Sequence, residues 1–317
     1  MTNKSSLRIL FMGTPSFAVA PLQALCDHGY KPAAVYTQPD KVNRRGGKIS
    51  FSPVKSYALE QDIPVFQPLT FKTEEAVEQV RSLRPDLIVV IAYGRILPQA
   101  VLDIPTYGAV NIHGSLLPEY RGAAPVQRAI IDEKKVTGVT LMKLDAGMDT
   151  GDMIAVKEVP ISQSVTAGEL LDELSAIGAE ELLKILPDLS GALAKAVPQD
   201  GSRATYAEKL TKDMGRIDWE KPAETLHALA RGMYPNPGTY TFFRGKRVKI
   251  HKTLLGGDAP ETAAPGTIVS LKEGILWIAC GKGTLGLARL QPENHKQMGA
   301  ADFINGYQVK VNDTFEN

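Results

Sequence analysis

Cysteine is scarce in this chain of 317 residues, which has only Cys26 and Cys280. The two lie far apart in apolar surroundings, so we expect reduced, buried thiols and no disulfide or metal pair. No apolar run reaches the ~18 residues that span a bilayer, and the first residues lack the apolar core and cleavage site of a signal peptide. These absences exclude a disulfide scaffold and favour a cytoplasmic protein with no membrane partner.

Signatures of several enzyme classes are also missing. The segment Gly13-Thr14-Pro15 matches neither the G-x-G-x-x-G turn nor the P-loop, which argues against a nucleotide cofactor. The nucleophile elbow G-x-S-x-G is absent. Outside the central motif described below, the histidines lack metal-ligand spacing; they are His28, His227, His251 and His295. We therefore expect no metal and no serine nucleophile.

The net charge is only +1, but it is unevenly distributed along the chain. From residue 209 onward there are 15 lysines and arginines against 11 acidic residues, which leaves the first 208 residues mildly acidic. A basic C-terminal part favours a polyanionic partner for that half of the chain.

Strand and helix patterns alternate through the first 189 residues. Buried strands are expected at Leu7–Met12, Ala33–Thr37, Pro64–Phe66, Asp86–Ala92 and Ala109–His113. Helices are expected between them, from Ser16 to about His28 and at Pro53–Gln61, Thr73–Leu83, Ile96–Leu102 and Pro125–Asp132. A strand pair, Val136–Leu144 and Met153–Val159, and a helix from about Thr166 to Leu186 follow. The order predicts an α/β fold with a doubly wound, Rossmann-like N-terminal sheet, to which the strand pair adds an edge.

The composition changes near residue 190. Residues 190–207 are rich in Ala, Gly, Pro and Ser and are predicted to form a linker. A helix at Pro222–Gly232 comes next, followed by short strands at Gly238–Phe243, Arg247–Thr253, Gly266–Ser270, Ile275–Ala279 and Thr284–Leu290, and a helix at Ala300–Tyr307. This pattern predicts a smaller OB-like β-barrel. The expected organisation is a catalytic domain at 1–189, a linker at 190–207 and a barrel domain at 208–317.

The segment 108–128, GAVNIHGSLLPEYRGAAPVQR, carries the strongest functional signal. Asn111 and His113 are two residues apart in a strand, so both side chains point to the same side. They end the strand at the carboxyl edge, where open α/β sheets place their chemistry. Asp149 follows in a glycine-bracketed turn, and an amide, an imidazole and a carboxylate on neighbouring loops predict an acyl-transfer site.

Taken alone, two of these residues could have a purely structural role. A lone histidine at a strand end is more often a hydrogen-bonded structural residue. Asp149 alone could form the turn between Gly147 and Gly151. The combination of His113 with Asn111, the following Leu-Leu-Pro and the distant Asp149 favours function.

The motifs resemble the formyltetrahydrofolate-dependent formyltransferase family over nearly the full length. The matching segments are Met12-Gly13-Thr14-Pro15, Thr37-Gln38-Pro39-Asp40 with the basic loop after it, the 111–118 block, the Asp149 turn and Arg231-Gly232-Met233-Tyr234-Pro235. The resemblance implies that the formyl group of 10-formyltetrahydrofolate, bound as a co-substrate, passes to the α-amino group of methionine on initiator methionyl-tRNA. Another folate-dependent formyltransferase that acts on an amino sugar, a formyltetrahydrofolate hydrolase, and a non-catalytic RNA-binding module are the alternatives.

The resemblance also implies roles for residues. Formyl transfer passes through a tetrahedral oxyanion, for which the Asn111 amide is a suitable donor. His113 either accepts the proton of the amine or stabilises the oxyanion, and Asp149 orients its ring or an intervening water.

Two binding surfaces are implied in the same way. The folate residues expected are Ile91, Ala92, Tyr93, Gly94, Ile96, Leu97, Ser115, Leu116, Leu117, Pro118 and Asp145; periodicity alone would assign most of them to the core. The tRNA-binding residues expected are Lys41, Arg44, Arg45 and Lys48 in the basic loop, which could otherwise be a solvated turn, and Arg244, Lys246, Arg247 and Lys249 in the barrel. A monomer is expected, because an enzyme that clamps a tRNA needs both domains free.

Overall fold

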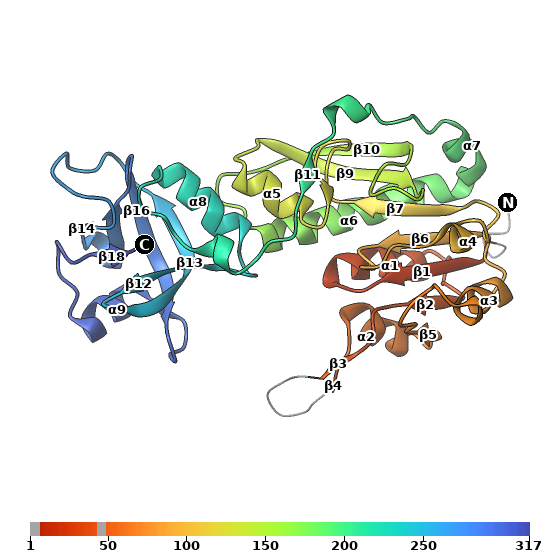
Figure 1. Cartoon of the computed structure of the whole chain (residues 1–317), viewed down its shortest axis with the longest axis horizontal. Helices are drawn as coiled ribbons and strands as arrows, with labels where there is room; N and C mark the ends of the chain where they lie inside the picture. The colour runs from red at the N-terminus through yellow and green to blue at the C-terminus, as the bar shows by residue number, and fades with distance from the viewer. Residues whose placement is uncertain (1–6, 43–48) are drawn as a thin grey trace. The chain divides into compact units, whose positions relative to one another are not determined.

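The computed structural model describes residues 7–42 and 49–317. Seven strands of the N-terminal part lie side by side in the order β10-β9-β7-β6-β1-β2-β5 (Figure 1). Their bounds are β1 Ile9–Gly13, β2 Ala34–Tyr36, β5 Val65–Phe66, β6 Leu87–Ile91, β7 Ala109–His113, β9 Val136–Lys143 and β10 Met153–Pro160. The strands from β5 to β7 pair in parallel, whereas β9 is antiparallel to β7. The predicted doubly wound sheet with a late edge is confirmed.

The central strands are buried on both faces, as their sequences require. The runs ILFMG of β1 and LIVVI of β6 are buried at every position, which is the pattern of a parallel sheet with helices on its faces. The helices of this part of the chain are α1 Val19–Asp27, α2 Pro53–Glu60, α3 Glu74–Ser82, α4 Gln99–Leu102, α5 Pro125–Ile131 and α6 Ala167–Ile185. A Cβ on Gly178 of α6 would lie only 2.6 Å from Ile112 Cγ2, so glycine lets this helix approach β7 closely.

Two predicted helices begin later than expected. Residues Ser16–Ala18 form a 3-10 turn before α1. The N-cap of this turn is Pro15, whose side chain cannot accept a hydrogen bond, so the predicted cap by Ser16 is not formed. The helix expected from Ile96 contains only Gln99–Leu102. Pro98 explains the late start, because a proline disfavours helical backbone at the residue before it.

The segment predicted as a linker contains regular structure. Helix α7 spans Leu189–Ala194, and a 3-10 turn spans Gly201–Arg203. Between them Val197 forms an antiparallel bridge with Met153 at the start of β10. This segment is therefore hydrogen-bonded to the edge of the N-terminal sheet.

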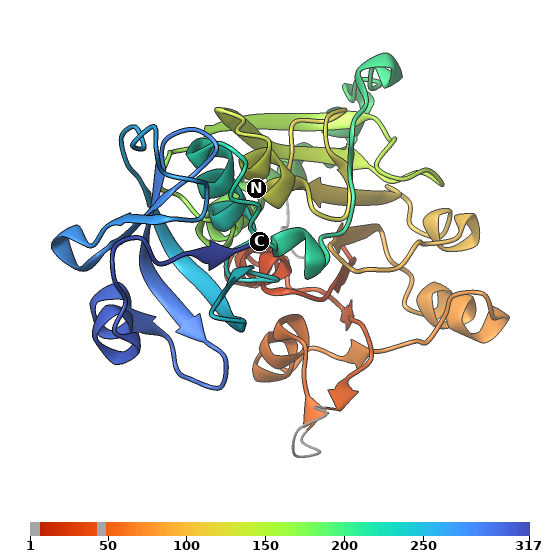
Figure 2. The same cartoon turned by 60° about the vertical axis from the view of Figure 1, so that its left-hand side comes forward.

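The C-terminal sheet is antiparallel and has the order β14-β15-β16-β13-β12-β18, with β17 beside β16. Its strands are β12 Thr239–Phe243, β13 Lys246–Leu255, β14 Ile268–Ser270, β15 Leu276–Ala279, β16 Thr284–Pro292, β17 Met298–Gly299 and β18 Phe315–Glu316, and its helices are α8 Ala223–Gly232 and α9 Ala300–Tyr307. The strands curl into a half-barrel (light to dark blue in Figure 2). Its core includes Trp219, Phe303 and Phe315. The smaller OB-like domain is confirmed.

The chain divides into two compact units whose boundaries cross the sequence more than once. One unit comprises residues up to 122 together with 137–160 and 171–206, and the other comprises 123–136, 161–170 and 207–317. Helix α5 belongs to the second unit, where it packs against α8. Gly232 permits this packing, because a Cβ there would lie 2.5 Å from Ile131 Cγ1. Arg231 adds hydrogen bonds to the carbonyls of Ser162 and Val165.

Candidate active site

Asn111 and His113 lie at the carboxyl end of β7, near the middle of the N-terminal sheet. Val90 of β6 is the register partner of Asn111, and Thr140 of β9 is the partner of His113. Both side chains are almost buried, with exposed fractions of 8% and 6%. Because they are two residues apart on one strand, they share one side of the sheet.

The His113 ring is hydrogen-bonded at one nitrogen and faces a carboxylate with the other. Its Nε2 lies 2.9 Å from the Tyr120 carbonyl oxygen, which can only accept, so Nε2 carries a hydrogen. Nδ1 then faces Asp149 Oδ2 at 3.6 Å. That distance is longer than a direct hydrogen bond, but it is short enough for the carboxylate to attract a positive charge on the ring. The nitrogen available for exchanging a proton is therefore Nδ1.

Asp149 is fixed by its own backbone and by one amide. Its φ is 54°, in the left-handed region, and its Oδ2 accepts a 2.8 Å hydrogen bond from Gly122 N. Upstream, Asp145 Oδ1 accepts from Gly147 N and from Thr150 Oγ1, at 2.9 and 2.7 Å. The predicted folate residue Asp145 thus organises the turn that presents the Asp149 carboxylate.

A buried threonine holds the loop that follows β7. Thr140 Oγ1 donates to the Ser115 carbonyl at 2.7 Å and accepts from Leu117 N at 3.1 Å. Ser115 is itself fully buried, and its hydroxyl donates to the Glu119 carbonyl at 2.6 Å. The peptide bond between Leu117 and Pro118 is cis. The 115–118 block is therefore ordered by its own hydrogen bonds, with Leu116 half-buried beside it.

The predicted folate residues after β6 divide into two groups. Ile91, Tyr93 and Leu97 point into the core, with exposed fractions of 6% or less. The Tyr93 hydroxyl has no hydrogen-bond partner among the described residues, and burial raises the pKa of Tyr93 to about 12. Ala92 and Ile96 face outward, and Ile96 is 81% exposed.

The backbone after β6 contains two residues in the left-handed region. Ala92 and Gly94 both have positive φ values, 47° and 83°. The Tyr93 carbonyl between them accepts hydrogen bonds from Thr14 Oγ1 at 3.0 Å and from Gln38 Nε2 at 3.1 Å. These hydrogen bonds join the segments that follow β1, β2 and β6.

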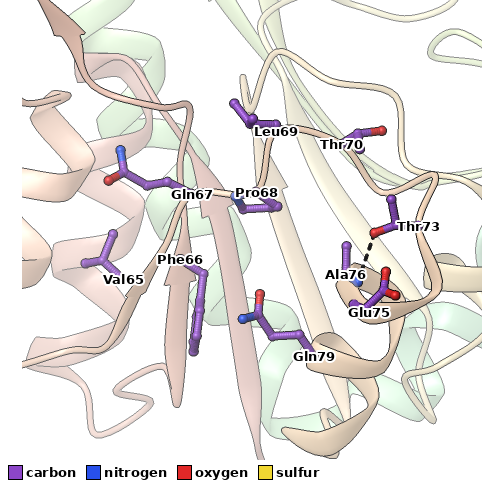
Figure 3. Close-up of a pocket in the computed structure, with 10 residues that line it drawn as sticks. All are labelled: Val65, Phe66, Gln67, Pro68, Leu69, Thr70, Thr73, Glu75, Ala76 and Gln79. Carbon is purple, nitrogen blue, oxygen red and sulfur yellow. Dashed lines mark hydrogen bonds between the residues drawn. The ribbon is translucent and has the colours of Figure 1, made fainter.

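A pocket of about 500 Å³ lies at a different place, where β5 meets α3 (Figure 3). Its lining residues are Val65, Phe66, Gln67, Pro68, Leu69, Thr70, Thr73, Glu75, Ala76 and Gln79. Strands β2, β1 and β6 separate β5 from β7 in the sheet. None of the predicted site residues lines this pocket.

Within residues 7–42 and 49–317, no group of three or more His, Cys, Asp or Glu side chains could hold a metal ion. In the same residues, no helix is both long enough and apolar enough to cross a bilayer.

Family models for formyl transferases match both parts of the chain. The formyl transferase model matches residues 7–186, and the model of the formyl transferase C-terminal domain matches residues 209–308. The chain belongs to the formyl transferase family.

Relatives of this formyltransferase are similar over nearly their whole length. It is 46% identical to the methionyl-tRNA formyltransferase of Acetivibrio thermocellus, over 96% of this chain and 97% of the relative. It is also 46% identical to the methionyl-tRNA formyltransferase of Stutzerimonas stutzeri, over 94% of each chain.

Solved structures share the fold of this formyltransferase at lower identity. HypX from Aquifex aeolicus in complex with tetrahydrofolic acid is 20% identical with a TM-score of 0.64; the match covers 97% of this chain and about half of HypX, 48%. The N-formyltransferase from Helicobacter canadensis, in complex with folinic acid and dTDP-3-aminofucose, is 20% identical with a TM-score of 0.65, over 89% and 98% of the two chains.

The base of the basic loop in this formyltransferase is held by a polar network. Lys55 Nζ donates to Asp40 Oδ2 at 2.5 Å and to Gln67 Oε1 at 2.8 Å, and Gln67 Nε2 donates to Asp40 Oδ1 at 2.9 Å. The hydrogen bond from Lys55 is the main reason that the pKa of Asp40 is below its ordinary value. Lys41 next to this network is exposed. The predicted tRNA-binding residues Arg44, Arg45 and Lys48 lie outside the described residues.

Replacing Lys55 by Met is expected to destabilise the protein at pH 6 and to lose this effect in acid. The lowered pKa of Asp40 means that its ion pair contributes stability above the ordinary carboxyl pKa of about 4, and that the contribution fades as pH falls through the folded-state pKa. Urea unfolding of wild type and K55M should therefore give free energies of unfolding that differ at pH 6 and converge as the pH falls to 3. The exposed Lys31→Met is the matched control, and a K55M difference that does not change with pH would refute the ion-pair assignment.

The basic residues of the barrel hairpin occupy two kinds of position. Lys246 and Lys249 are exposed. Arg247 lies with its guanidinium carbon 3.7 Å from the centre of the Tyr240 ring. Arg244 donates to the Tyr307 carbonyl at 2.9 Å and to Asp313 Oδ2 at 3.0 Å. The two lysines are thus exposed, whereas the two arginines have contacts within the domain.

Sequence reasoning missed Gln199 and Arg121, which contact the backbone and side chains around Asp149. Gln199 Nε2 donates to the carbonyls of Asp149 and Gly151 at 2.9 and 2.8 Å. Its Oε1 accepts from Arg121 Nε at 3.1 Å and from Arg121 Nη2 at 2.7 Å. Arg121 lies within the 108–128 motif, but nothing in that motif assigns it a partner. Gln199 falls in the segment predicted as a linker, so no sequence signal could have found the contact between them.

Proposed function

We propose that the chain transfers the formyl group of 10-formyltetrahydrofolate to the α-amino group of methionine on initiator methionyl-tRNA. The observation that carries this proposal is the placement of the Asn111 amide, His113 Nδ1 and the Asp149 carboxylate at the end of β7 in a chain with formyl transferase models over both of its parts. The relatives named methionyl-tRNA formyltransferase support the choice of acceptor.

The folate co-substrate fits the segment after β6. Ile96 is an apolar side chain left 81% exposed near the sheet's carboxyl edge, and a flat apolar ring system would cover it. The predicted set from Ile91 to Leu97, the 115–118 block and Asp145 remains our assignment for this pocket. In it the exposed Ala92 and Ile96 contact folate, and the buried members support them.

The reaction needs no covalent enzyme intermediate. The neutral α-amine attacks the formyl carbon, and the Asn111 amide donates to the developing oxyanion. The ammonium nitrogen then loses a proton to His113 Nδ1, and Asp149 Oδ2, 3.6 Å from that nitrogen, stabilises the imidazolium that forms. Collapse of the intermediate releases tetrahydrofolate, whose N10 takes the proton back.

Domain roles follow from the same assignment. Residues 1–189 form the catalytic domain, 190–207 connect it to the rest, and 208–317 bind tRNA through Lys246, Lys249 and neighbouring cations, together with the basic loop at 41–48. The protein acts as a monomer in the cytoplasm, and light scattering of the protein with and without tRNA tests the monomeric state.

The deciding assay measures formyl transfer from 10-formyltetrahydrofolate to initiator methionyl-tRNA, to free methionine and to a blank without an amine. Transfer only to the charged tRNA is expected. Formate release in the blank at a comparable rate would favour a formyltetrahydrofolate hydrolase, and transfer to an amino sugar nucleotide would favour the other formyltransferase class.

Replacing Lys246 and Lys249 together by Gln is expected to weaken tRNA binding and to lower the slope of log K against log salt by about 1 to 2, because each cation that neutralises a phosphate releases a counterion. Binding of folate should be unchanged. Filter binding between 50 and 200 mM salt measures this. The double variant of the exposed Lys272 and Lys310 is the control, and equal slopes for both double variants would remove the hairpin from the tRNA surface.

A further inference from the structure

The backbone on either side of Arg121 contacts both members of the His113–Asp149 pair. The Tyr120 carbonyl accepts from His113 Nε2 at 2.9 Å, and the Gly122 amide donates to Asp149 Oδ2 at 2.8 Å. Any movement of this short segment would therefore change the relative positions of the imidazole and the carboxylate.

Gln199 ties this segment to the Asp149 turn. Its side-chain oxygen accepts two hydrogen bonds from the Arg121 guanidinium, and its side-chain nitrogen donates to the carbonyls of Asp149 and Gly151. Arg121 is only 6% exposed, so these bonds form in a largely buried place. These contacts form a closed cycle of hydrogen bonds. It runs from the Asp149 carbonyl through Gln199 and Arg121 to the Gly122 amide, which donates to the Asp149 carboxylate.

The donors and acceptors in this hydrogen-bonded cycle require an amide at position 199. Arginine only donates and a carbonyl only accepts, so the bridging group needs an acceptor facing Arg121 and a donor facing Asp149 and Gly151. This also fixes which atom of the Gln199 amide is oxygen and which is nitrogen. A glutamate of the same size could accept from Arg121 but would set a carboxylate oxygen against two carbonyl oxygens.

The backbone at the turn leaves little other freedom. Gly151 lies so close to β9 that a Cβ there would be 1.9 Å from the Lys143 carbonyl oxygen. The chain carrying Gln199 is held at the sheet edge by the Val197–Met153 bridge, whose two hydrogen bonds measure 2.8 and 2.9 Å. The backbone that carries Gln199 is therefore fixed beside the Asp149 turn, so its side chain can hold Arg121 at a set distance from that turn.

We propose that Gln199 is a positioning residue that sets the distance between the Asp149 carboxylate and His113 Nδ1. Its side chain donates to the Asp149 carbonyl and not to the carboxylate, so it acts through Arg121 and the Asp149 turn. This inference rests on the proposed function insofar as it assigns the proton transfer to His113 and Asp149.

The test uses two variants of the full chain. Gln199→Glu keeps the acceptor for Arg121 and removes both donated hydrogen bonds, whereas Gln199→Met removes both sets. Each should lower kcat by about 10- to 100-fold, because small misplacements of catalytic groups have effects of this size, with KM for charged tRNA changing by less than about 3-fold. The exposed Gln23→Glu on α1 is the matched control and should retain wild-type kcat.

A second readout does not depend on activity. With 15N-glycine labelling, the Gly122 amide proton reports its hydrogen bond to Asp149 Oδ2 and should move upfield in both variants and not in Gln23→Glu. Wild-type kcat in Gln199→Glu, an unmoved Gly122 resonance, or a loss confined to Gln199→Met would overturn the proposal. Failure of the proposed function would instead appear as absent transfer by the wild type, while the Gly122 comparison still decides the role of Gln199. Should Gln199→Met not fold, Gln199→Glu decides both readouts alone.

Discussion

Replacing His113 by Ala is expected to lower kcat for formyl transfer by at least about 100-fold with little change in KM, because the substitution removes the group that we propose to accept the proton in the transition state. The ring is almost buried between the Tyr120 carbonyl and Asp149. Steady-state kinetics with charged tRNA and 10-formyltetrahydrofolate measure the effect.

The control is His28→Ala, which removes an exposed histidine at the end of α1 whose Nδ1 contacts the Ala24 carbonyl. This variant should retain wild-type kcat. Turnover close to wild type in His113→Ala would remove His113 from the mechanism. Binding of tRNA should survive in His113→Ala, which separates loss of chemistry from loss of the acceptor.

Asn111 should show the second large effect. Asn111→Ala is expected to lower kcat by about 100-fold or more, since losing one oxyanion donor has an effect of this size. Asn111→Asp preserves shape and removes the donor, so it should be equally impaired at neutral pH. Asn305→Ala on the exposed side of α9 is the control. If Asn111→Asp turned over like wild type, the amide would have no role in stabilising the oxyanion.

The sheet, and the placement of Asn111 and His113 on one side of it, could be predicted because both depend on local periodicity. Strands buried on both faces leave uninterrupted apolar runs, as in β1 and β6. A spacing of two residues in β7 puts both side chains on one side of the sheet. Each of these patterns is contained in five to seven consecutive residues, so the sequence alone predicts it.

The remaining features depend on contacts between distant residues. The Gln199 side chain meets residues 50 and 78 positions away, and one glutamine in an Ala- and Pro-rich segment carries no sign of this. Our proposal that Nδ1 exchanges the proton depends on the position of the Tyr120 carbonyl, which the loop after β7 determines. Periodicity holds no information on either point.

Three non-glycine residues at the site have left-handed backbone: Ala92, Tyr120 and Asp149, with φ values of 47°, 59° and 54°. Each such residue costs of order 1 kcal/mol relative to a relaxed backbone. Relaxing the backbone at these three positions would recover that free energy, but it would also move the Asp149 carboxylate and the Tyr120 carbonyl that holds His113. A gain in thermal stability here would therefore come with a loss of turnover.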